Sequence, residues 1–335
     1  MSREIGIVGA GGWGTALAKV LADKGERVTL WCHGTECYRE LTSQRENRSY
    51  LPGIQIPDAV KVTQSLENVV GGKFLVICAV PSHAVREVFA KVAGEITPET
   101  FMLCATKGLE EGTNRTMGEL FTDLFGPAND HRQGFLSGPT FAREVALGLP
   151  AAMTVAARLA KIAEAIQETL STPNLRVYTS TDVLGVQMGG VVKNTIAIAA
   201  GISDGLGLGH NARAALITRG LAEMTRLATQ MGADSRTLSG LPGLGDLVLT
   251  CTGDLSRNRN VGLQIAAGKK LAEITESTRS VAEGVRNTRS LFLLAQKLGV
   301  EMPIVEQMYA VLYLGKQPAV AVRDLMQRSL KAEGG

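Results

Sequence analysis

The chain has 335 residues, 45% of them hydrophobic, and a formal net charge of +3. At about 100–200 residues per domain, this length predicts two domains with substantial cores. The mild charge, without a run of five basic residues, argues against a nucleic-acid-binding protein. The opening segment MSREIGIVGAGGWG does not have the order of regions found in a signal peptide, and we expect no membrane insertion.

The first half of the chain alternates between strand and helix patterns. Short runs rich in β-branched and aromatic residues occur at 4–8, 27–32, 74–80, 101–106, 134–138, 151–157 and 175–180. Helical patterns such as 83–94 separate them. This rhythm is typical of an α/β fold, with helices on both faces of a doubly wound parallel sheet of the Rossmann type.

The pattern changes after about residue 181. Apolar residues then recur at spacings of three and four, as in 213–231 and 288–300. We expect a dinucleotide-binding Rossmann domain at 1–181 and an all-helical substrate and catalytic domain at 182–335. No Ser/Pro-rich linker separates the two, so the domains should pack directly.

The first strand leads into GAGGWG (9–14), the G-x-G-x-x-G pattern of a dinucleotide site. Gly9 permits the tight turn, Gly11 lets the backbone approach a pyrophosphate, and Gly14 lets the helix pack close to the strand. The start of the following helix would offer N–H groups to the phosphates. The alternative is a glycine-rich turn with a purely structural use.

The second strand carries information about the choice of cofactor. A carboxylate at its tip would bind the ribose 2′-hydroxyl of NAD, but residues 30–35 contain no acid. His33 could donate to a 2′-phosphate, so we expect NADPH to be favoured, or tolerated beside NADH. Glu36 and Arg39 lie close enough to leave the choice open, and His33 could be an ordinary loop histidine.

Three further strand ends carry chemical groups, at Val80-Pro81-Ser82, at Lys107 and at Gly138-Pro139-Thr140. Ligands of doubly wound sheets bind beyond the carboxyl ends of the strands. Lys107 would lie where nicotinamide and substrate meet. The alternative for Lys107 is a solvated loop lysine.

The segment 185–201 is apolar and helical in pattern, and Lys193 is its one charged residue. A buried charge is costly unless it is paired. Burial lowers the pKa of a lysine, which suits a proton donor. Gly189 and Gly190, one turn earlier, are expected to let a ligand approach closely. The alternative is a lysine that snorkels from a half-buried helix. For a proton donor, Lys193→Met should keep or raise stability, whereas the snorkelling alternative predicts near-normal turnover and little change in folding.

The segment 240–260 is rich in glycine and carries Asp246, Thr250 and Ser256-Arg257-Asn258. Its glycines could let the backbone bend around a small ligand. Arg257 offers a planar fork of donors suited to phosphate or carboxylate. A polar loop with surface arginines is the alternative.

The five cysteines, Cys32, Cys37, Cys78, Cys104 and Cys251, are odd in number and match no metal-binding spacing. Together with four scattered histidines, they predict a reduced, cytoplasmic protein without a metal site.

These segments together resemble the bacterial NAD(P)-dependent glycerol-3-phosphate dehydrogenases. The resemblance runs through GAGGWGTALA, AVPSHAVREV, ATKGLE, SGPTFAREV, the long block from Lys193 to Met224, and GLGDLVLTCTGDLSRNRNVG. It implies a homodimer that interconverts dihydroxyacetone phosphate and sn-glycerol 3-phosphate for glycerophospholipid biosynthesis.

The resemblance also implies roles for individual residues. Cofactor contacts would be Gly12, Trp13, His33, Tyr50, Lys107, Ala142, Arg257, Val281 and Glu283. Substrate contacts would be Lys107, Gly138, Thr140, Asp246, Ser256, Arg257 and Asn258, with Asn194 and Thr250 nearby. Lys193 falls on the proton-transferring lysine, which Asp246 would orient while Lys107 polarises the same substrate oxygen.

Two other functions are weighed against this one. A related hydroxyacid dehydrogenase would share the architecture and the helix-borne lysine. A non-catalytic NADP-binding redox sensor would share the dinucleotide site but would not need a proton donor.

Overall fold

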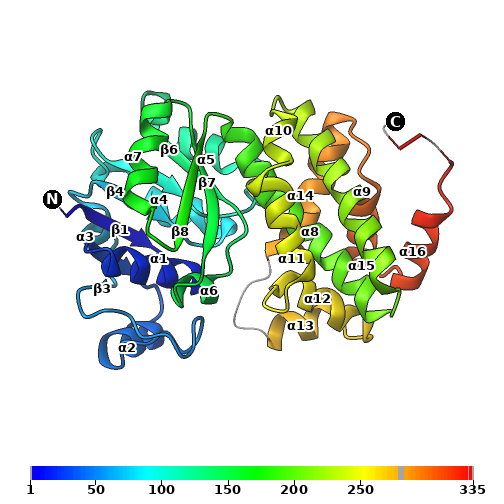
Figure 1. The fold of residues 1–335 in the computed structure, drawn as a ribbon, viewed down its shortest axis with the longest axis horizontal. Coiled ribbons are helices and arrows are strands. Elements are labelled where there is room, and N and C mark those ends of the chain that lie inside the picture. The colour runs from blue at the N-terminus through cyan, green and yellow to red at the C-terminus, as the bar shows by residue number, and fades with distance from the viewer. Residues whose placement is uncertain (1, 278–282, 331, 334–335) are drawn as a thin grey trace.

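The computed structural model describes residues 2–277, 283–330 and 332–333. Figure 1 shows two lobes side by side, one built around a sheet and the other from helices. Beyond Ser180, the regular elements within these described residues are all helical. The predicted combination of a Rossmann-type sheet and a helical second part is confirmed.

In the described residues, eight strands form one sheet in the order β3-β2-β1-β4-β5-β6-β7-β8. Neighbouring strands are parallel except β6 and β7, so the last two strands run against the first six. The order of the first six is that of a dinucleotide-binding sheet. The strands are β1 Glu4–Val8, β2 Arg27–Trp31, β3 Lys61–Thr63, β4 Leu75–Cys78, β5 Phe101–Cys104, β6 Gln133–Ser137, β7 Ala151–Ala157 and β8 Leu175–Ser180.

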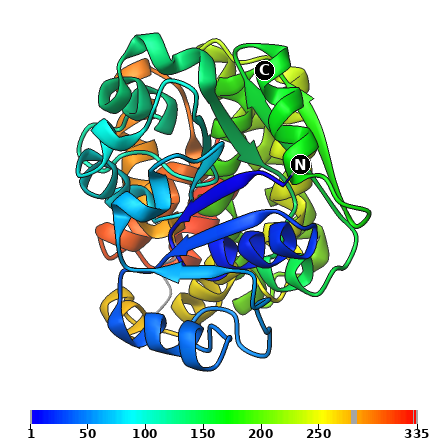
Figure 2. The ribbon, with the colours of Figure 1, turned by 90° about the vertical axis from the view of Figure 1, so that its left-hand side faces the viewer.

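Helices cover both faces of the sheet, as Figure 2 shows from its end. Alternate residues of a strand face opposite sides. Leu75 and Ile77 accordingly join a core with α1 and α7, whereas Val76 and Cys78 join one with α4 and α5. The helices of this part are α1 Gly12–Asp23, α2 Thr35–Ser43, α3 Leu66–Val70, η1 Ser82–Ala84, α4 Val85–Ala90, η2 Ala93–Glu95, α5 Met117–Phe125, η3 Pro127–Arg132, α6 Ala142–Ala146 and α7 Ala160–Leu170.

The second lobe is organised around α8, whose residues from Met188 to Ser203 are all buried. A helix that is apolar all round belongs in a core, and α9, α11, α12 and α14 pack around this one. The elements are α8 Val183–Gly205, α9 Gly209–Gln230, α10 Ser235–Leu238, η4 Leu241–Gly245, α11 Asp246–Thr252, α12 Arg257–Ala266, α13 Leu271–Ser277, α14 Glu283–Leu298, α15 Pro303–Tyr313 and α16 Pro318–Met326.

Among the described residues, α8 is the one helix long and apolar enough to cross a membrane. Of its most apolar window, 83% is buried inside the protein. The core of the helical lobe therefore accounts for the apolar character of α8.

The start of α15 is held by a buried carboxylate. Glu223 of α9 is 4% exposed and accepts hydrogen bonds from the N–H groups of Ile304 at 2.8 Å and Val305 at 3.3 Å. Burial raises the pKa of Glu223 to about 7. The two N–H donors and Arg226 oppose this rise, and Glu306 adds to it.

This carboxyl group should make stability depend on pH. The pKa of Glu223 in the folded protein lies above the unfolded value of about 4.3. The contribution of Glu223 to the free energy of unfolding is therefore fully present below the unfolded pKa and is lost as pH rises through about 7. Between pH 5 and pH 8, the free energy of unfolding should fall by roughly 2–3 kcal/mol more in the wild type than in Glu223→Gln. Urea unfolding at each pH measures this, with the exposed Glu95→Gln as control. Equal pH slopes for wild type and Glu223→Gln would contradict the argument.

Candidate active site

The turn between β1 and α1 has the geometry of a dinucleotide-binding loop. Gly9 has a φ of +120°, and a Cβ there would lie 2.8 Å from the carbonyl carbon of Ala79. A Cβ at Gly14 would collide with the carbonyl oxygen of Gly9, so helix and turn meet without room for a side chain. Beside Gly11 the space is open: apart from Gly11 and its two chain neighbours, no atom lies within 4 Å of a Cβ built there. The start of α1 can therefore receive a phosphate group.

Four residues predicted to contact the cofactor gather at the start of α1. A Cβ on Gly12 would lie 2.8 Å from the Tyr50 carbonyl oxygen and 3.8 Å from the Ala142 Cβ. Trp13 and Ala142 both pack on the small apolar cluster that includes Leu51. The loop around Tyr50 and the start of α6 therefore flank the predicted pyrophosphate site.

His33 lies beyond β2 and is exposed. Its ring centroid is 5.7 Å from that of Trp31. Gly34 caps α2, and the first acid after the strand, Glu36, is in the first turn of that helix. His33 is therefore positioned at the end of β2, where the predicted 2′-substituent would lie.

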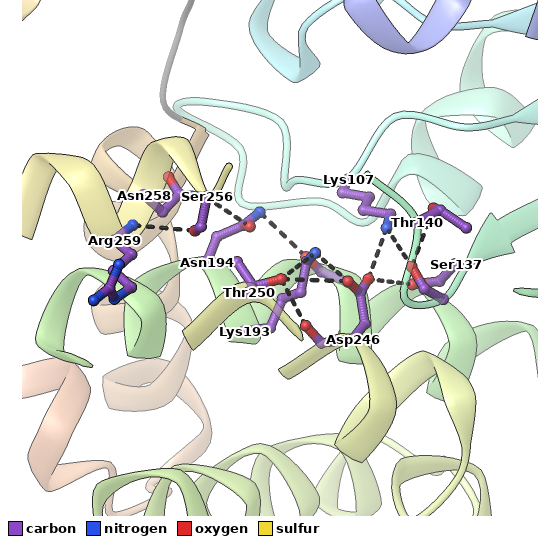
Figure 3. Close-up of polar contacts among 12 residues, drawn as sticks. Lys107, Ser137, Thr140, Lys193, Asn194, Asp246, Thr250, Ser256, Asn258 and Arg259 are labelled. Atoms are coloured by element: carbon purple, nitrogen blue, oxygen red, sulfur yellow. Dashed lines mark hydrogen bonds and ion pairs between the residues drawn. The ribbon is translucent and has the colours of Figure 1, made fainter. Parts of the chain in front are cut away.

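The partner of Lys193 is Asp246, and the two are buried together, with exposures of 7% and 1%. Lys193 Nζ donates to Asp246 Oδ1 and, at 2.9 Å, to Thr250 Oγ1. Lys107 Nζ donates to Asp246 Oδ2 at 2.7 Å and to the Gly138 carbonyl at 3.2 Å. In Figure 3 both lysines reach this carboxylate, each at a different oxygen.

Burial sets the proton affinity of this cluster. It lowers the pKa of Lys193 to about 8, against the attraction of Asp246, and the Lys107 charge lowers it further. Burial also disfavours the Asp246 carboxylate, but Lys107 and Lys193 together hold the pKa of Asp246 below its usual range. Two cations around one carboxylate leave an excess positive charge, which would stabilise negative charge on a bound substrate.

The backbone brings these groups together through close packing. The π-helical turn η4 leads directly into α11, which places Asp246 at the start of that helix. A Cβ on Gly189 would collide with the Pro242 carbonyl, and one on Gly190 would lie 2.9 Å from Ser137 Oγ. The expectation that a ligand approaches these two glycines is therefore wrong, because the protein's own chain occupies the space.

The glycines of 240–260 also serve internal packing. A Cβ on Gly243 would collide with the Leu238 carbonyl. Thr250, one turn after Asp246, donates to the Asp246 carbonyl at 2.6 Å. Gly243 thus lets η4 pack on α10, and Thr250 braces the first turn of α11, which carries Asp246.

The start of α12 presents the predicted phosphate-binding residues. Ser256 caps the helix by accepting from the Arg259 N–H at 3.2 Å, and Arg257 is its exposed first residue. Asn258 donates to Asn194 Oδ1 at 2.8 Å, which links α12 to α8. Arg259 instead forms ion pairs with Asp204 at 2.8 Å and Asp254 at 3.0 Å.

Glu283 has protein partners of its own. Its carboxylate accepts from Ser82 N at 3.0 Å and from Ser82 Oγ at 2.8 Å. A contact between the two lobes therefore engages both carboxylate oxygens of this predicted cofactor contact. Val281 lies outside the described residues.

Most of the predicted residues thus gather at three places. Lys107, Gly138, Lys193, Asp246 and Thr250 form one cluster, next to which Thr140 donates to the Gly138 carbonyl at 3.3 Å. A second group surrounds the start of α1, and the third lies at the start of α12, next to Asn194.

Two polar contacts around the cluster were not predicted. Ser137, the last residue of β6, lies 3.5 Å from Asp246 Oδ2. Asn287 of α14 contacts the loop that carries Lys107. Ser137 could have been found as the residue before Gly138, whereas no local pattern marks Asn287. Among the described residues, no group of three or more His, Cys, Asp or Glu side chains could hold a metal ion.

Comparison with known families agrees with this geometry. Residues 4–163 match the family model described as NAD-dependent glycerol-3-phosphate dehydrogenase N-terminus, and residues 182–323 match the model of its C-terminus. The chain belongs to the NAD-dependent glycerol-3-phosphate dehydrogenase family. The predicted resemblance is confirmed over most of the chain.

Individual members of the family are similar over their full length. The glycerol-3-phosphate dehydrogenase [NAD(P)+] of Geobacter sp. (strain M21) is 52% identical over 334 residues, covering 100% of both chains. The enzyme of the same name from Geobacter sulfurreducens is 50% identical, with 99% of each chain covered. The crystal structure of glycerol-3-phosphate dehydrogenase from Coxiella burnetii superimposes with a TM-score of 0.93 at 40% identity, covering 98% of this chain and 99% of that one.

Proposed function

We propose that the protein is an oxidoreductase that interconverts dihydroxyacetone phosphate and sn-glycerol 3-phosphate with NAD(P)H. The observation that carries the proposal is the buried Lys193–Asp246–Lys107 cluster, which lies beyond the strand ends of a dinucleotide-binding sheet. The names of full-length relatives at about 50% identity supply the substrate.

Lys193 is the proposed proton donor and acceptor. When bound, the reduced nicotinamide supplies the hydride that the ketone carbon needs. Lys193 donates a proton to the ketone oxygen, and a pKa of about 8 suits this exchange near neutral pH. Asp246 holds the ammonium in place, and Lys107 polarises the same oxygen. When Lys193 becomes neutral, Lys107 still balances the Asp246 charge.

The phosphate of the substrate is assigned to the start of α12. Arg257 and the N–H groups of the first turn offer charge-assisted hydrogen bonds to an anion. Ser256 and Asn258 fix this turn through the Ser256 cap and the Asn258–Asn194 bond. Gly138, Thr140, Asn194 and Thr250 are proposed to complete the substrate site.

The cofactor is assigned to the turn from Gly9 to Gly14. Gly12, Trp13, Tyr50 and Ala142 line the start of α1, and Lys107, Arg257, Val281 and Glu283 are proposed as contacts toward the nicotinamide. Because residues 30–35 carry no acid and His33 is exposed there, we assign NADPH as the favoured or tolerated cofactor beside NADH.

The wider biological setting follows from the same assignment. Residues 1–181 would bind the cofactor and 182–335 the substrate, in a homodimer. The product, sn-glycerol 3-phosphate, is the backbone of glycerophospholipids. Five free cysteines support a cytoplasmic location, where thiols stay reduced.

Initial rates with dihydroxyacetone phosphate and each reduced cofactor test the proposal directly. Unphosphorylated dihydroxyacetone and a panel of 2-oxo acids serve as comparison substrates. Preference for a 2-oxo acid would favour a hydroxyacid dehydrogenase of the same architecture. Cofactor binding without turnover on any phosphorylated ketone would favour a redox sensor.

Lys193→Met should lower turnover by roughly 10²–10⁴-fold, which is the usual contribution of a positioned acid–base group. Because Asp246 loses one of its two partners but keeps Lys107, the variant should lose less stability than the roughly 3–5 kcal/mol that a fully unpaired buried charge costs. This replaces the expectation that stability holds or rises. Stopped assays and urea unfolding measure the two effects, with exposed Lys61→Met as control. Turnover within about threefold of wild type would rule out the proton-donor role.

Arg257→Ala should raise the KM for dihydroxyacetone phosphate by about tenfold or more, because a charge-assisted bond to phosphate is lost. Unphosphorylated dihydroxyacetone should be hardly affected. Arg236→Ala, at an exposed arginine of α10, controls for the loss of a surface charge. An equal rise of KM for both substrates would show that Arg257 does not bind the phosphate.

His33→Asp should shift the cofactor preference toward NADH, because a carboxylate accepts from the 2′-hydroxyl and repels the 2′-phosphate. The ratio of kcat/KM for NADPH and NADH measures the shift, with exposed His131→Asp as control. If the wild type strongly prefers NADH and the variant keeps the same ratio, the role of His33 is refuted.

A further inference from the structure

The loop that carries Lys107 follows β5 in the sheet lobe but is anchored in the helical lobe. Leu109, two residues after Lys107, is 2% exposed and packs in the apolar core that includes Met188 of α8 and Leu291 of α14. The main chain around Lys107 therefore depends on the position of the helices as well as on the sheet.

Asn287 of α14 holds this loop by both ends of its amide. Its Oδ1 accepts from the Leu109 N–H at 3.2 Å, and its Nδ2 donates to the Lys107 carbonyl at 3.4 Å. The side chain is 1% exposed. Between the two bonds, a Cβ on Gly108 would lie 3.0 Å from Asn287 Oδ1 and 2.6 Å from the Cβ of Ser82. Gly108 therefore lies tightly between Asn287 of α14 and Ser82 of η1, which donates to Glu283.

The same buried face of α14 is also fixed to the helix of Lys193. Thr288 Oγ1 lies 3.0 Å from Thr195 Oγ1 of α8, and the Gly284 N–H donates to Asn258 Oδ1 at 3.0 Å. Leu291, Leu294 and Ala295 continue this face into the core. α14 therefore connects the main chain at Lys107 to α8, at a position two residues from Lys193.

We infer that Asn287 is a positioning residue for the reaction: it fixes the main chain of Lys107 so that the two lysine ammonium groups share the Asp246 carboxylate. The inference rests on the proposed function for its kinetic meaning. Asn287 acts through Lys107, and its bonds are to the main chain of the loop.

Displacing Lys107 should change the proton affinity of Lys193. The ionisable groups that act on Lys193 are Asp246 and Cys251 of α11 and Lys107 of the loop. Without Lys107, Lys193 would lose a neighbouring cation and would have the carboxylate to itself, and both changes raise the pKa of Lys193. Reduction needs the ammonium and oxidation needs the neutral amine, so the pH profiles in both directions should move to higher pH.

Kinetics of Asn287→Leu, which removes both hydrogen bonds, test this inference. We expect kcat to fall by roughly 10–100-fold, as for a misplaced catalytic group, and both pH profiles to shift upward. Asn287→Ser perturbs the site less and carries the same test if the leucine variant does not fold. Thr100→Val is the control, because it removes a buried hydroxyl bond, to the Lys73 carbonyl at 2.9 Å, at the end of β5 away from Lys107. It should lower the melting temperature without moving the pH profiles.

A double-variant cycle separates positioning from general destabilisation. In a Lys107→Met background, Asn287→Leu should cause no further loss of kcat, because residues that act through one another are not additive. Additive losses, or pH profiles unchanged as in Thr100→Val, would overturn the inference.

Amine labelling followed by mass spectrometry gives a readout that needs no turnover. Lys107 should react faster in Asn287→Leu than in the wild type, while exposed Lys61 reacts equally in both. Unchanged labelling of Lys107 would overturn the inference, whether or not the wild type reduces dihydroxyacetone phosphate. Failure of the wild type to reduce dihydroxyacetone phosphate would instead refute the proposed function.

Discussion

The Asp246 carboxylate, buried between two lysines, is the interaction on which the site depends. Taking an ion out of water costs several kcal/mol, and the cost is offset only by close, well-formed pairing. The three groups come from a loop of the sheet lobe, from α8 and from α11. If one lobe shifted, a buried charge would lose its partner, so the pairing couples catalytic geometry to the contact between the lobes.

Close backbone packing along α8 makes this arrangement possible. The carbonyls of Pro242 and Arg259 approach Gly189 and Gly201 so closely that a Cβ at either position would collide with them. η4 and α12 can therefore lie directly against α8 and bring Asp246 and Asn258 within reach of Lys193 and Asn194. The glycines of α8 thus allow close packing inside the protein, and its buried polar side chains Lys193 and Asn194 contribute to the candidate site.

Much of the fold could be predicted because its signals are local. Each buried strand is a short apolar run, and G-x-G-x-x-G fixes a turn whose geometry depends on its own residues. β3 escaped prediction because three residues, one exposed and two half-buried, make no pattern. The partner of Lys193 is 53 positions away and that of Glu283 is 201 positions away. The sequence indicated that a buried lysine needs a partner, but naming it from the residues alone requires the packing of three segments, and Asn287 has no local pattern at all.

The N-terminal cap of α8 also sets a register. Asp182 accepts from the N–H groups of Gly185 at 2.9 Å and Asp234 at 3.0 Å, which fixes where the helix starts. Lys193 lies three turns further along a helix that advances about 1.5 Å and rotates about 100° per residue. One residue inserted or deleted between cap and lysine would turn the ammonium away from Asp246 while leaving composition and hydropathy almost unchanged. The spacing of these eleven positions is therefore as strict a requirement as the lysine itself.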